Sequence, residues 1–356
     1  MSNSILSLDN VLGKIYESAE DSFSEIKNLL LAEDPLVLER LFLFADEVRR
    51  KNVGEGVLLR GIIEFSNHCS NNCFYCGLND KNTGLKRYRM TADEILDSVS
   101  CLAEMGIKTV VLQSGEDDKL DPLWFADVIK TIKKRFDIAV TISVGEKDKN
   151  QYKLWHEAGA DRYLLKVETS DPHIYALAHN GRRLEPRLEC LDSLIDIGYQ
   201  AGSGLLIGLK AQTVDSIARD IIFLGRKGID MIGIGPFIPH PDTVFAGNAA
   251  GNIQLTLKTI AITRIVTRSA HMPATTAIGS SGGDHRIEAL NAGANVLMPN
   301  FTPLRYKELY EIYPGKACIS EELKSCVSCM SKKAESVGRF LDYSVGHSLK
   351  RNHIFN

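Results

Sequence analysis

The sequence predicts an α/β protein, a TIM-type (β/α)8 barrel with an N-terminal helical cap and a short C-terminal extension. From Leu58 onward, short runs rich in β-branched residues alternate with amphipathic helical segments. With 356 residues, of which 44% are hydrophobic, the chain is long enough to bury such a core. Glycines precede several of the strand-like runs, as expected where helices end in the left-handed backbone conformation: Gly106, Gly159, Gly198, Gly228 and Gly293.

The chain divides into three predicted parts, at residues 1–50, 51–310 and 311–356. The first is the helical cap, because apolar residues such as Leu38, Leu41 and Phe44 recur with charged residues between them. The second is the barrel, with strands at 58–65, 108–113, 139–144, 163–167, 202–207, 231–234, 274–277 and 295–298. Helices are predicted at 91–105, 121–136, 152–157, 188–197, 214–227, 255–267 and 284–291. Right-handed crossovers should direct all the carboxyl ends of the strands to one mouth.

Charge and cysteine usage limit the class of protein. The formal charge is −3, with acidic and basic residues mixed along the chain, so no nucleic-acid or membrane partner is expected. The first 30 residues do not resemble a signal peptide, and no apolar run could span a bilayer. Cysteines at ligand spacings favour metal binding over disulfides. We therefore expect a cytoplasmic protein that acts on a small molecule.

Three cysteines, Cys69, Cys73 and Cys76, lie in one loop directly after the first predicted strand. Three thiolates at this spacing can hold three irons of a 4Fe-4S cube, one cysteine for each iron. The fourth iron then keeps an open position, which is typical of a catalytic metal centre. A zinc site completed by His68 is the alternative, although the second ligand pair usual for zinc is missing before Cys101.

The spacing Cys69-x3-Cys73-x2-Cys76, with Tyr75 before the last cysteine, resembles the signature of radical S-adenosylmethionine (radical SAM) enzymes. More narrowly, the chain resembles the HydE family of FeFe-hydrogenase maturases, from about residue 41 to the C-terminal cysteines. The matching segments are 60–77, 85–91, 112–117, 159–165 and 233–243. The resemblance implies two cofactors, a 4Fe-4S cluster and S-adenosylmethionine, and reductive cleavage of the latter to a 5'-deoxyadenosyl radical.

The resemblance also assigns cofactor contacts at the strand ends. The segment 114–116 corresponds to the motif that meets the methionyl ammonium group, and Glu168 to the residue that holds the ribose hydroxyls. Arg187 corresponds to the arginine that pairs with the methionyl carboxylate, whereas without the motif it reads as part of an ordinary ion pair. The implied contacts, including those around the adenine, are Tyr75, Ser114, Gly115, Glu116, Glu168, Arg187 and Ile234.

Substrate contacts are implied inside the barrel. Cationic and hydroxyl side chains are costly to bury unless something pairs with them, and an anionic substrate would do so. The implied substrate is a cysteine-bound iron carbonyl cyanide unit on the way to the diiron centre of the hydrogenase H-cluster. The implied contacts are Arg60, Gln113, Thr141, Ser143, Arg162, Lys166, Thr275, Thr276, Met298 and Tyr310.

A second cysteine group, Cys318, Cys326 and Cys329, lies in the C-terminal extension. By resemblance it holds an accessory iron–sulfur cluster away from the radical chemistry. Cys101 and Cys190, on predicted helices, are interpreted as buried small hydrophobes. The implied partners are an electron donor such as ferredoxin or flavodoxin and the other hydrogenase maturases, a tyrosine lyase and a scaffold GTPase.

Three segments depart from the HydE pattern. Lys166-Val167 stands where Arg-His is expected, Lys210-Ala211 where Pro-Gly is expected, and 280–286 also differs. None includes the first cysteine triplet, so radical generation is expected while the substrate is less determined. A methylornithine synthase-like or biotin synthase-like radical SAM enzyme, and a non-catalytic iron–sulfur scaffold, stay open as alternatives. Cleavage of S-adenosylmethionine by the reduced protein would separate the enzymes from the scaffold.

Overall fold

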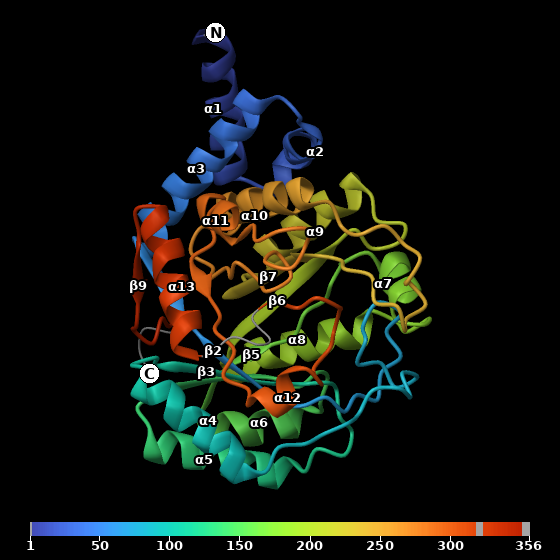
Figure 1. The fold of residues 1–356 in the computed structure, drawn as a ribbon. Coiled ribbons are helices and arrows are strands. Elements are labelled where there is room, and N and C mark those ends of the chain that lie inside the picture. Colours follow the sequence, from blue (N-terminus) through green and yellow to red (C-terminus); the bar gives the residue numbers. More distant parts are fainter. Residues whose placement is uncertain (1, 318–322, 351–356) are drawn as a thin grey trace.

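Six parallel strands form a curved sheet surrounded by helices in the computed structural model, which describes residues 2–317 and 323–350 (Figure 1). The strands follow one another in the sheet in the order of the sequence, as in a barrel wall. They are β2 (Gly61–Ser66), β3 (Thr109–Ser114), β4 (Ala139–Ser143), β5 (Ala160–Leu164), β6 (Gln200–Ile207) and β7 (Met231–Pro236).

Shorter pairings complete the ring. β1 (Gly56–Leu59) precedes β2 and pairs with β8 (Val296–Leu297) on one side and β9 (Phe340–Asp342) on the other. Single bridges join Met231 to His271 and Pro273 to Val296, so that the segment after β7 links it to β8. The predicted barrel architecture is therefore confirmed, although no strand forms at the expected residues 274–277, and the isolated bridges lie just before them at His271 and Pro273.

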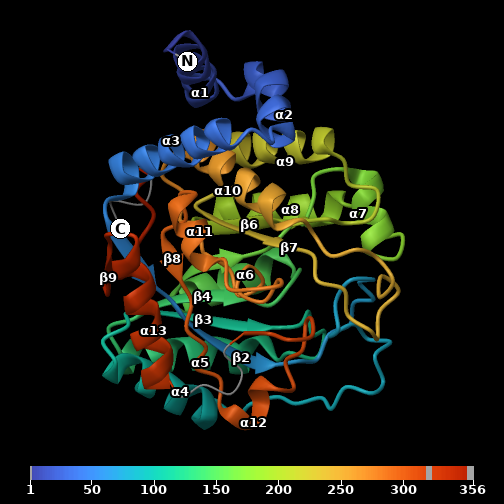
Figure 2. The ribbon, with the colours of Figure 1, turned by 45° about the horizontal axis from the view of Figure 1, so that its top comes forward.

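Helices cover the outside of the ring (Figure 2). Local sequence signals explain where several begin and end: Thr91 and Thr213 form capping boxes, and the glycines expected at helix ends have positive φ. The barrel helices are α4 (Ala92–Glu104), α5 (Pro122–Arg135), α6 (Lys149–Glu157), α7 (Pro172–Ala178), α8 (Glu185–Ile197), α9 (Val214–Lys227), α10 (Ile253–Thr267), α11 (Arg286–Asn291) and α12 (Leu304–Lys307).

Some elements differ from the prediction. The single strand expected at 58–65 is divided at Arg60 into β1 and β2, which belong to different sheets. β5 begins three residues earlier than predicted and ends at Leu164. The sequence also did not predict α7, α13 (Leu323–Ser336) or β9. β9 is three residues long and exists because it pairs with β1, and so short a run carries no period of its own.

Strand side chains alternate between the interior of the barrel and the layer beneath the helices. On β3, Val110 and Leu112 are fully buried among the hydrophobic side chains that pack against the helices, so Gln113 faces inward. On β4 the same alternation directs Thr141 and Ser143 inward. The interior of the barrel is therefore more polar than the layer around it.

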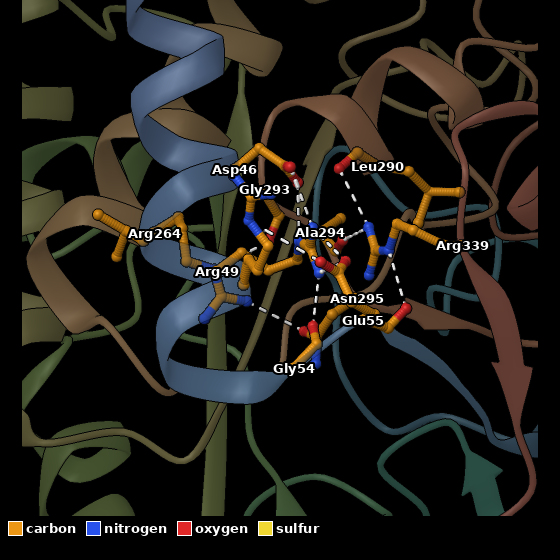
Figure 3. A network of polar contacts seen from close by, with 12 residues as sticks. Asp46, Arg49, Gly54, Glu55, Arg264, Leu290, Gly293, Ala294, Asn295 and Arg339 are labelled. Carbon is orange, nitrogen blue, oxygen red and sulfur yellow. Dashed lines mark hydrogen bonds and ion pairs between the residues drawn. The ribbon is translucent and has the colours of Figure 1, made fainter.

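The N-terminal helices are α1 (Ser2–Glu17), a 3-10 turn (Glu20–Ser22), α2 (Phe23–Leu31) and α3 (Pro35–Val53). α3 lies against α10, and α2 against α9, while α1 projects from the barrel (Figure 1). Buried arginines link these parts near the amino ends of the strands (Figure 3). Arg264 on α10 donates to the Gly293 carbonyl at 2.8 Å, and Arg339 before β9 donates to the Ala294 carbonyl at 2.9 Å.

The C-terminal segment 345–348 closes the amino-terminal end of the barrel, which we call the floor. Arg162 Nη2 and Thr109 Oγ1 each donate to the Val345 carbonyl at 2.9 Å. Arg60 Nη2 donates to the Gly346 carbonyl at 3.2 Å. The opposite end, where the strands finish, is the mouth. No helix among the described residues is both long and apolar enough for a membrane span.

Candidate active site

The loop after β2 brings Cys69, Cys73 and Cys76 to the mouth, and all three thiols are free. Burial, together with the neighbouring Cys69 thiol, raises the pKa of the Cys73 thiol to about 12. Burial likewise raises the pKa of Cys76. Because such thiols stay protonated at neutral pH, they need a nearby positive charge to ionise. The irons of a cluster would supply that charge.

The described residues offer no ligand group for a single metal ion. Among the residues that the structure describes, no three His, Cys, Asp or Glu side chains are grouped to hold one metal ion. A 4Fe-4S cube needs a wider spacing, because each thiolate binds a different iron. The alternative of a zinc ion held by His68 and the cysteines is therefore not supported.

Gly115, at the end of β3, lies so close to the cysteine loop that no side chain would fit. A Cβ atom at Gly115 would lie 2.3 Å from the His68 carbonyl oxygen and 2.8 Å from Cys69 Cβ. The Ser70 amide also donates to the Glu116 carbonyl at 2.8 Å. The segment 114–116 thus lies directly beside the cysteines, as the resemblance implies.

Two arginines and two glutamates alternate beside this segment. Arg187 on α8 lies 2.8 Å from Glu146 through Nε and 3.6 Å from Glu116 through Nη2. Arg182 lies 2.9 Å from Glu146 and 3.5 Å from Glu116, and it also donates to Asn71 in the cysteine loop. The structure therefore brings the predicted residues Glu116 and Arg187 together.

Sequence reasoning missed Arg182 and Glu146. Glu146 follows β4, and its amide donates to Glu116 Oε2 at 2.7 Å. Its position after a strand was a usable signal, because charged residues at strand ends share the mouth of a barrel. Arg182 lies in the turn between α7 and α8 and carries no such signal.

Tyr75 is held by a histidine that the sequence did not single out. His179 Nδ1 lies 2.8 Å from the Tyr175 carbonyl, which can only accept, so this nitrogen carries the proton. His179 Nε2, 3.2 Å from the Tyr75 hydroxyl, is then the acceptor. Burial, together with the charge of Arg187, lowers the pKa of His179 to about 3, so the ring is neutral. The phenol of Tyr75 therefore has one defined orientation.

Glu168 lies four residues beyond the end of β5 with a φ of 63°, an unusual conformation for a residue other than glycine. Its Oε2 atom is 2.9 Å from Lys166 Nζ. The following turn is held by Asp220 on α9, which is fully buried and accepts from the Ser170 amide at 2.5 Å and the Ser170 hydroxyl at 2.6 Å. Burial raises the pKa of Asp220 to about 6.

The predicted interior residues are partly brought together. Gln113 Nε2 donates to the Tyr310 hydroxyl at 3.2 Å. Beside them lies a buried ion pair between Glu64 on β2 and Lys316, which sequence reasoning missed because the two residues are 252 positions apart. Half-buried residues in the segments after β7 and β8 lie on the same side of the barrel: Thr275, Thr276 and Met298.

Three of the predicted substrate and cofactor contacts lie away from the mouth of the barrel. Arg60 and Arg162 lie at the floor, where carbonyls of segment 345–348 supply partners that we expected from a substrate. The Ile234 side chain alternates with inward-facing glycines and lies in the hydrophobic layer beneath the helices, not at the mouth. The assignments of Arg60 and Arg162 as substrate contacts and of Ile234 as a cofactor contact stay predictions.

The remaining cysteines differ in placement. Cys326 is buried and Cys329 half-buried on α13, three residues apart, whereas Cys318 lies outside the described residues. Cys101 is exposed on α4, so its interpretation as a buried hydrophobe is wrong. Cys190 is half-buried on α8, with its sulfur 3.6 Å from the Lys147 carbonyl.

Known proteins share this arrangement. Residues 63–224 match the Radical SAM superfamily. The "[FeFe] hydrogenase maturase subunit HydE" of Thermotoga maritima is 46% identical over 323 residues, covering 91% of this chain and 92% of that protein. The chain belongs to the HydE family. It is thus a radical SAM enzyme, and its cofactors are a 4Fe-4S cluster and S-adenosylmethionine, as the sequence predicted.

More distant relatives support the fold of this HydE-family chain. The 3-methylornithine synthase of Methanosarcina acetivorans is 28% identical, and the match covers 82% of each chain. The solved structure of methylornithine synthase (PylB) has a TM-score of 0.81 at 25% identity, covering 93% of this chain and 97% of that one. HydG from Carboxydothermus hydrogenoformans has a TM-score of 0.79 at 18% identity, covering 98% and 82%, which shows a common fold alone.

Proposed function

We propose that this enzyme acts in assembly of the diiron centre of the FeFe-hydrogenase H-cluster, on a cysteine-bound iron carbonyl cyanide precursor. The observation that carries the proposal is the 46% identity to a hydrogenase maturase subunit over 91% of the chain. The match extends over nearly the whole barrel, including the segments that form the mouth and the interior, where substrate is bound in such folds.

In this proposal Cys69, Cys73 and Cys76 hold three irons of the cluster. When bound, the cluster supplies the electron that cleaves S-adenosylmethionine at its open iron position. The protein positions the cofactor: Glu168 accepts hydrogen bonds from the ribose hydroxyls, and Tyr75, oriented by His179, packs near the adenine. The floor, closed by segment 345–348, limits the entry of water to the radical.

The contact between Glu116 and Arg187 fits the methionyl end of the cofactor. A separation of 3.6 Å is long for a hydrogen-bonded ion pair, and both side chains are about nine-tenths buried. An amino acid zwitterion placed there gives its carboxylate to Arg187 and its ammonium to Glu116. Glu146 keeps Arg187 in place meanwhile, through its own contact at 2.8 Å.

The interior then holds the substrate. Gln113, Thr141, Ser143 and Tyr310 offer hydrogen-bonding groups on inward positions, of which the Thr141 hydroxyl is buried without a partner. Lys166 supplies a positive charge near Glu168. These groups suit a substrate with anionic or hydrogen-bond-accepting ligands such as carboxylate and cyanide.

The test is an anaerobic maturation assay with apo-hydrogenase and the other maturases. We expect active hydrogenase only when this protein, reconstituted with iron and sulfide, is included. Formation of 5'-deoxyadenosine by the reduced protein is the matching control for its radical chemistry. Cleavage of S-adenosylmethionine without any maturation would reject the hydrogenase assignment and leave the enzyme class intact.

The likeness to the PylB structure, with a TM-score of 0.81, favours methylornithine synthesis as the second candidate. Formation of 3-methylornithine by the reduced protein would decide for it. We further propose a cytoplasmic location, a ferredoxin or flavodoxin as electron donor, and a tyrosine lyase and a scaffold GTPase as partners. A second cluster at Cys318, Cys326 and Cys329 is also part of the proposal, although Cys318 lies outside the described residues.

A further inference from the structure

Gly233, in the middle of β7, borders an empty space although it is buried. A Cβ atom built on Gly233 would meet no atom within 4 Å. Among the residues that the structure describes, the other glycines whose Cβ position is open are half-buried or exposed. A buried position with nothing beside it is the wall of an internal cavity.

This cavity lies inside the barrel. Met231, two residues before Gly233 on the same strand, is contacted at its sulfur by Arg60 Nη1 at 2.8 Å, and Arg60 also donates to segment 345–348 at the floor. Met231 therefore faces the interior. Because side chains two residues apart on a strand share a face, Gly233 faces the interior as well.

The neighbouring inward glycines have no such space. A Cβ on Gly204, which pairs with Gly233 across β6 and β7, would lie 2.0 Å from the Gly233 carbonyl and 2.9 Å from Lys166 Cε. A Cβ on Gly235 would lie 3.1 Å from Thr275 Oγ1. The space is therefore local to Gly233, on the same level as the stem of Lys166.

The cavity lies close to the position proposed for the cofactor ribose. The Glu168 amide donates to the Gly204 carbonyl at 3.0 Å. Glu168 therefore lies next to Gly204, on the side nearer the mouth. Two polar groups on inward-facing side chains also lack a hydrogen-bond partner. The Thr141 hydroxyl and Arg60 Nε are buried, and neither has a hydrogen-bond partner. Both donate, so a ligand that enters this interior should present an acceptor.

We propose that Gly233 is a specificity-determining residue: the side chain it lacks leaves room for the part of the substrate that lies deepest in the barrel. This inference rests on the proposed function and refines it. The substrate class is one whose inner end carries a hydrogen-bond acceptor and is too bulky for a barrel with a side chain at position 233. Residues with larger side chains would close this space and leave the cofactor site at the mouth open.

The test is the variant Gly233→Val, since a β-branched side chain suits a strand and φ at this position is not positive. We expect its melting temperature to equal or exceed that of the wild type, because the side chain fills existing space. The dissociation constant for S-adenosylmethionine and substrate-free formation of 5'-deoxyadenosine should stay within about twofold. Maturation of apo-hydrogenase should fall about tenfold or more, the range that small volume changes in a pocket produce.

Gly204→Val is the matched control on the paired strand. Its side chain would overlap the Gly233 backbone, so we expect it to lower the melting temperature and both activities together. A Gly233→Val protein that matures hydrogenase normally would overturn the proposal. So would one that binds S-adenosylmethionine more weakly, because the space would then belong to the cofactor.

A probe that needs no substrate separates this inference from the proposed function. The melting temperature is such a probe: Gly233→Val should melt at a temperature equal to or higher than that of the wild type, whereas Gly204→Val should melt lower, because only position 233 has room for a side chain. If the wild type supports no maturation at all, the proposed function fails, while this comparison still tests the space. A Gly233→Val protein as destabilised as Gly204→Val would remove the space on which the inference rests.

Discussion

Arginines at the two ends of the barrel differ in their partners. At the floor, Arg264 donates to the Gly293 carbonyl (Figure 3) and to the Arg268 carbonyl. Arg162 donates to carbonyls of segment 345–348, and Arg49 pairs with Asp46 and Glu55 of its own segment. Burial, together with the charges of the nearby Arg49 and Arg339, lowers the pKa of Arg264 to about 9. At the mouth, Arg182 and Arg187 pair with the carboxylates of glutamates.

The type of acceptor explains this difference. Backbone carbonyls are fixed by the fold, so an arginine that they bind joins segments and has no partner to exchange. A carboxylate on a side chain can move away when a ligand brings a better partner. Buried charge at the floor therefore indicates a structural role, whereas the alternating charges at the mouth fit the proposed binding of a zwitterion there.

The largest expected effect concerns the mouth. Cys73→Ala should abolish formation of 5'-deoxyadenosine, a loss of about a thousandfold or more, because one iron of the cluster loses its ligand. Cys326→Ala, on α13 away from the mouth, should keep most of the activity. The measurement is product formation after anaerobic reconstitution and reduction, with iron content as control. Activity retained by Cys73→Ala would contradict the ligand assignment.

The second-largest expected effect is a loss of stability at the floor. Arg264→Met should destabilise the protein by about 3 kcal/mol, because buried carbonyls and Asn295 lose their donor. Chemical denaturation measures this loss. The KM for S-adenosylmethionine should stay unchanged below the unfolding transition. A change in KM without a loss of stability would erase the distinction between the two ends of the barrel.

The pH dependence of stability tests the orientation of Tyr75. Since folding lowers the pKa of His179 from the ordinary value to about 3, the unfolded chain binds more protons between these pH values. The contribution of His179 to the stability of the folded protein is fully present above about pH 6.5 and is lost as the pH falls toward 3. Between pH 7.5 and pH 5, the free energy of unfolding of the wild type should fall by about 2 kcal/mol more than that of His179→Gln. Denaturation curves at pH 7.5 and 5 compare the two proteins, and parallel losses would show a charged or exposed ring.

The smallest expected effect tests whether Arg187 binds the methionyl carboxylate at the mouth. Arg187→Lys keeps the charge and loses the planar fork that binds a carboxylate with two parallel bonds. We expect the KM for S-adenosylmethionine to rise about tenfold, with kcat within about threefold and nearly unchanged stability. Steady-state kinetics of 5'-deoxyadenosine formation measures both constants. An effect on kcat alone would argue that Arg187 does not bind the methionyl carboxylate.

Much of the fold was predictable because its signals are local. The alternation of strands and helices, the glycines with positive φ such as Gly106 and Gly228, and the capping threonines act within a few residues. The cysteine loop was predictable for the same reason, since its three ligands span eight residues in Cys69–Cys76. The separate assignments of Glu116 and Arg187 to the cofactor followed only from the family resemblance, and their contact was not predicted.

Long-range contacts were not predictable in this way. Arg162 looked like a substrate contact because a buried arginine needs a partner, yet its partners are carbonyls more than 180 residues away. The same holds for the pair of Glu64 and Lys316. A sequence shows that a buried charge needs a partner, but it does not show which segment supplies one.

By itself, then, the sequence determined the kind of fold and the three thiols of the cluster loop, because periodicity and ligand spacing are properties of neighbouring residues. Only the tertiary structure decided which polar residues face the mouth and which bind the C-terminal segment at the floor. It also revealed the empty space at Gly233. The physical reason is that burial and pairing depend on which distant segments meet, and this is settled when the barrel closes.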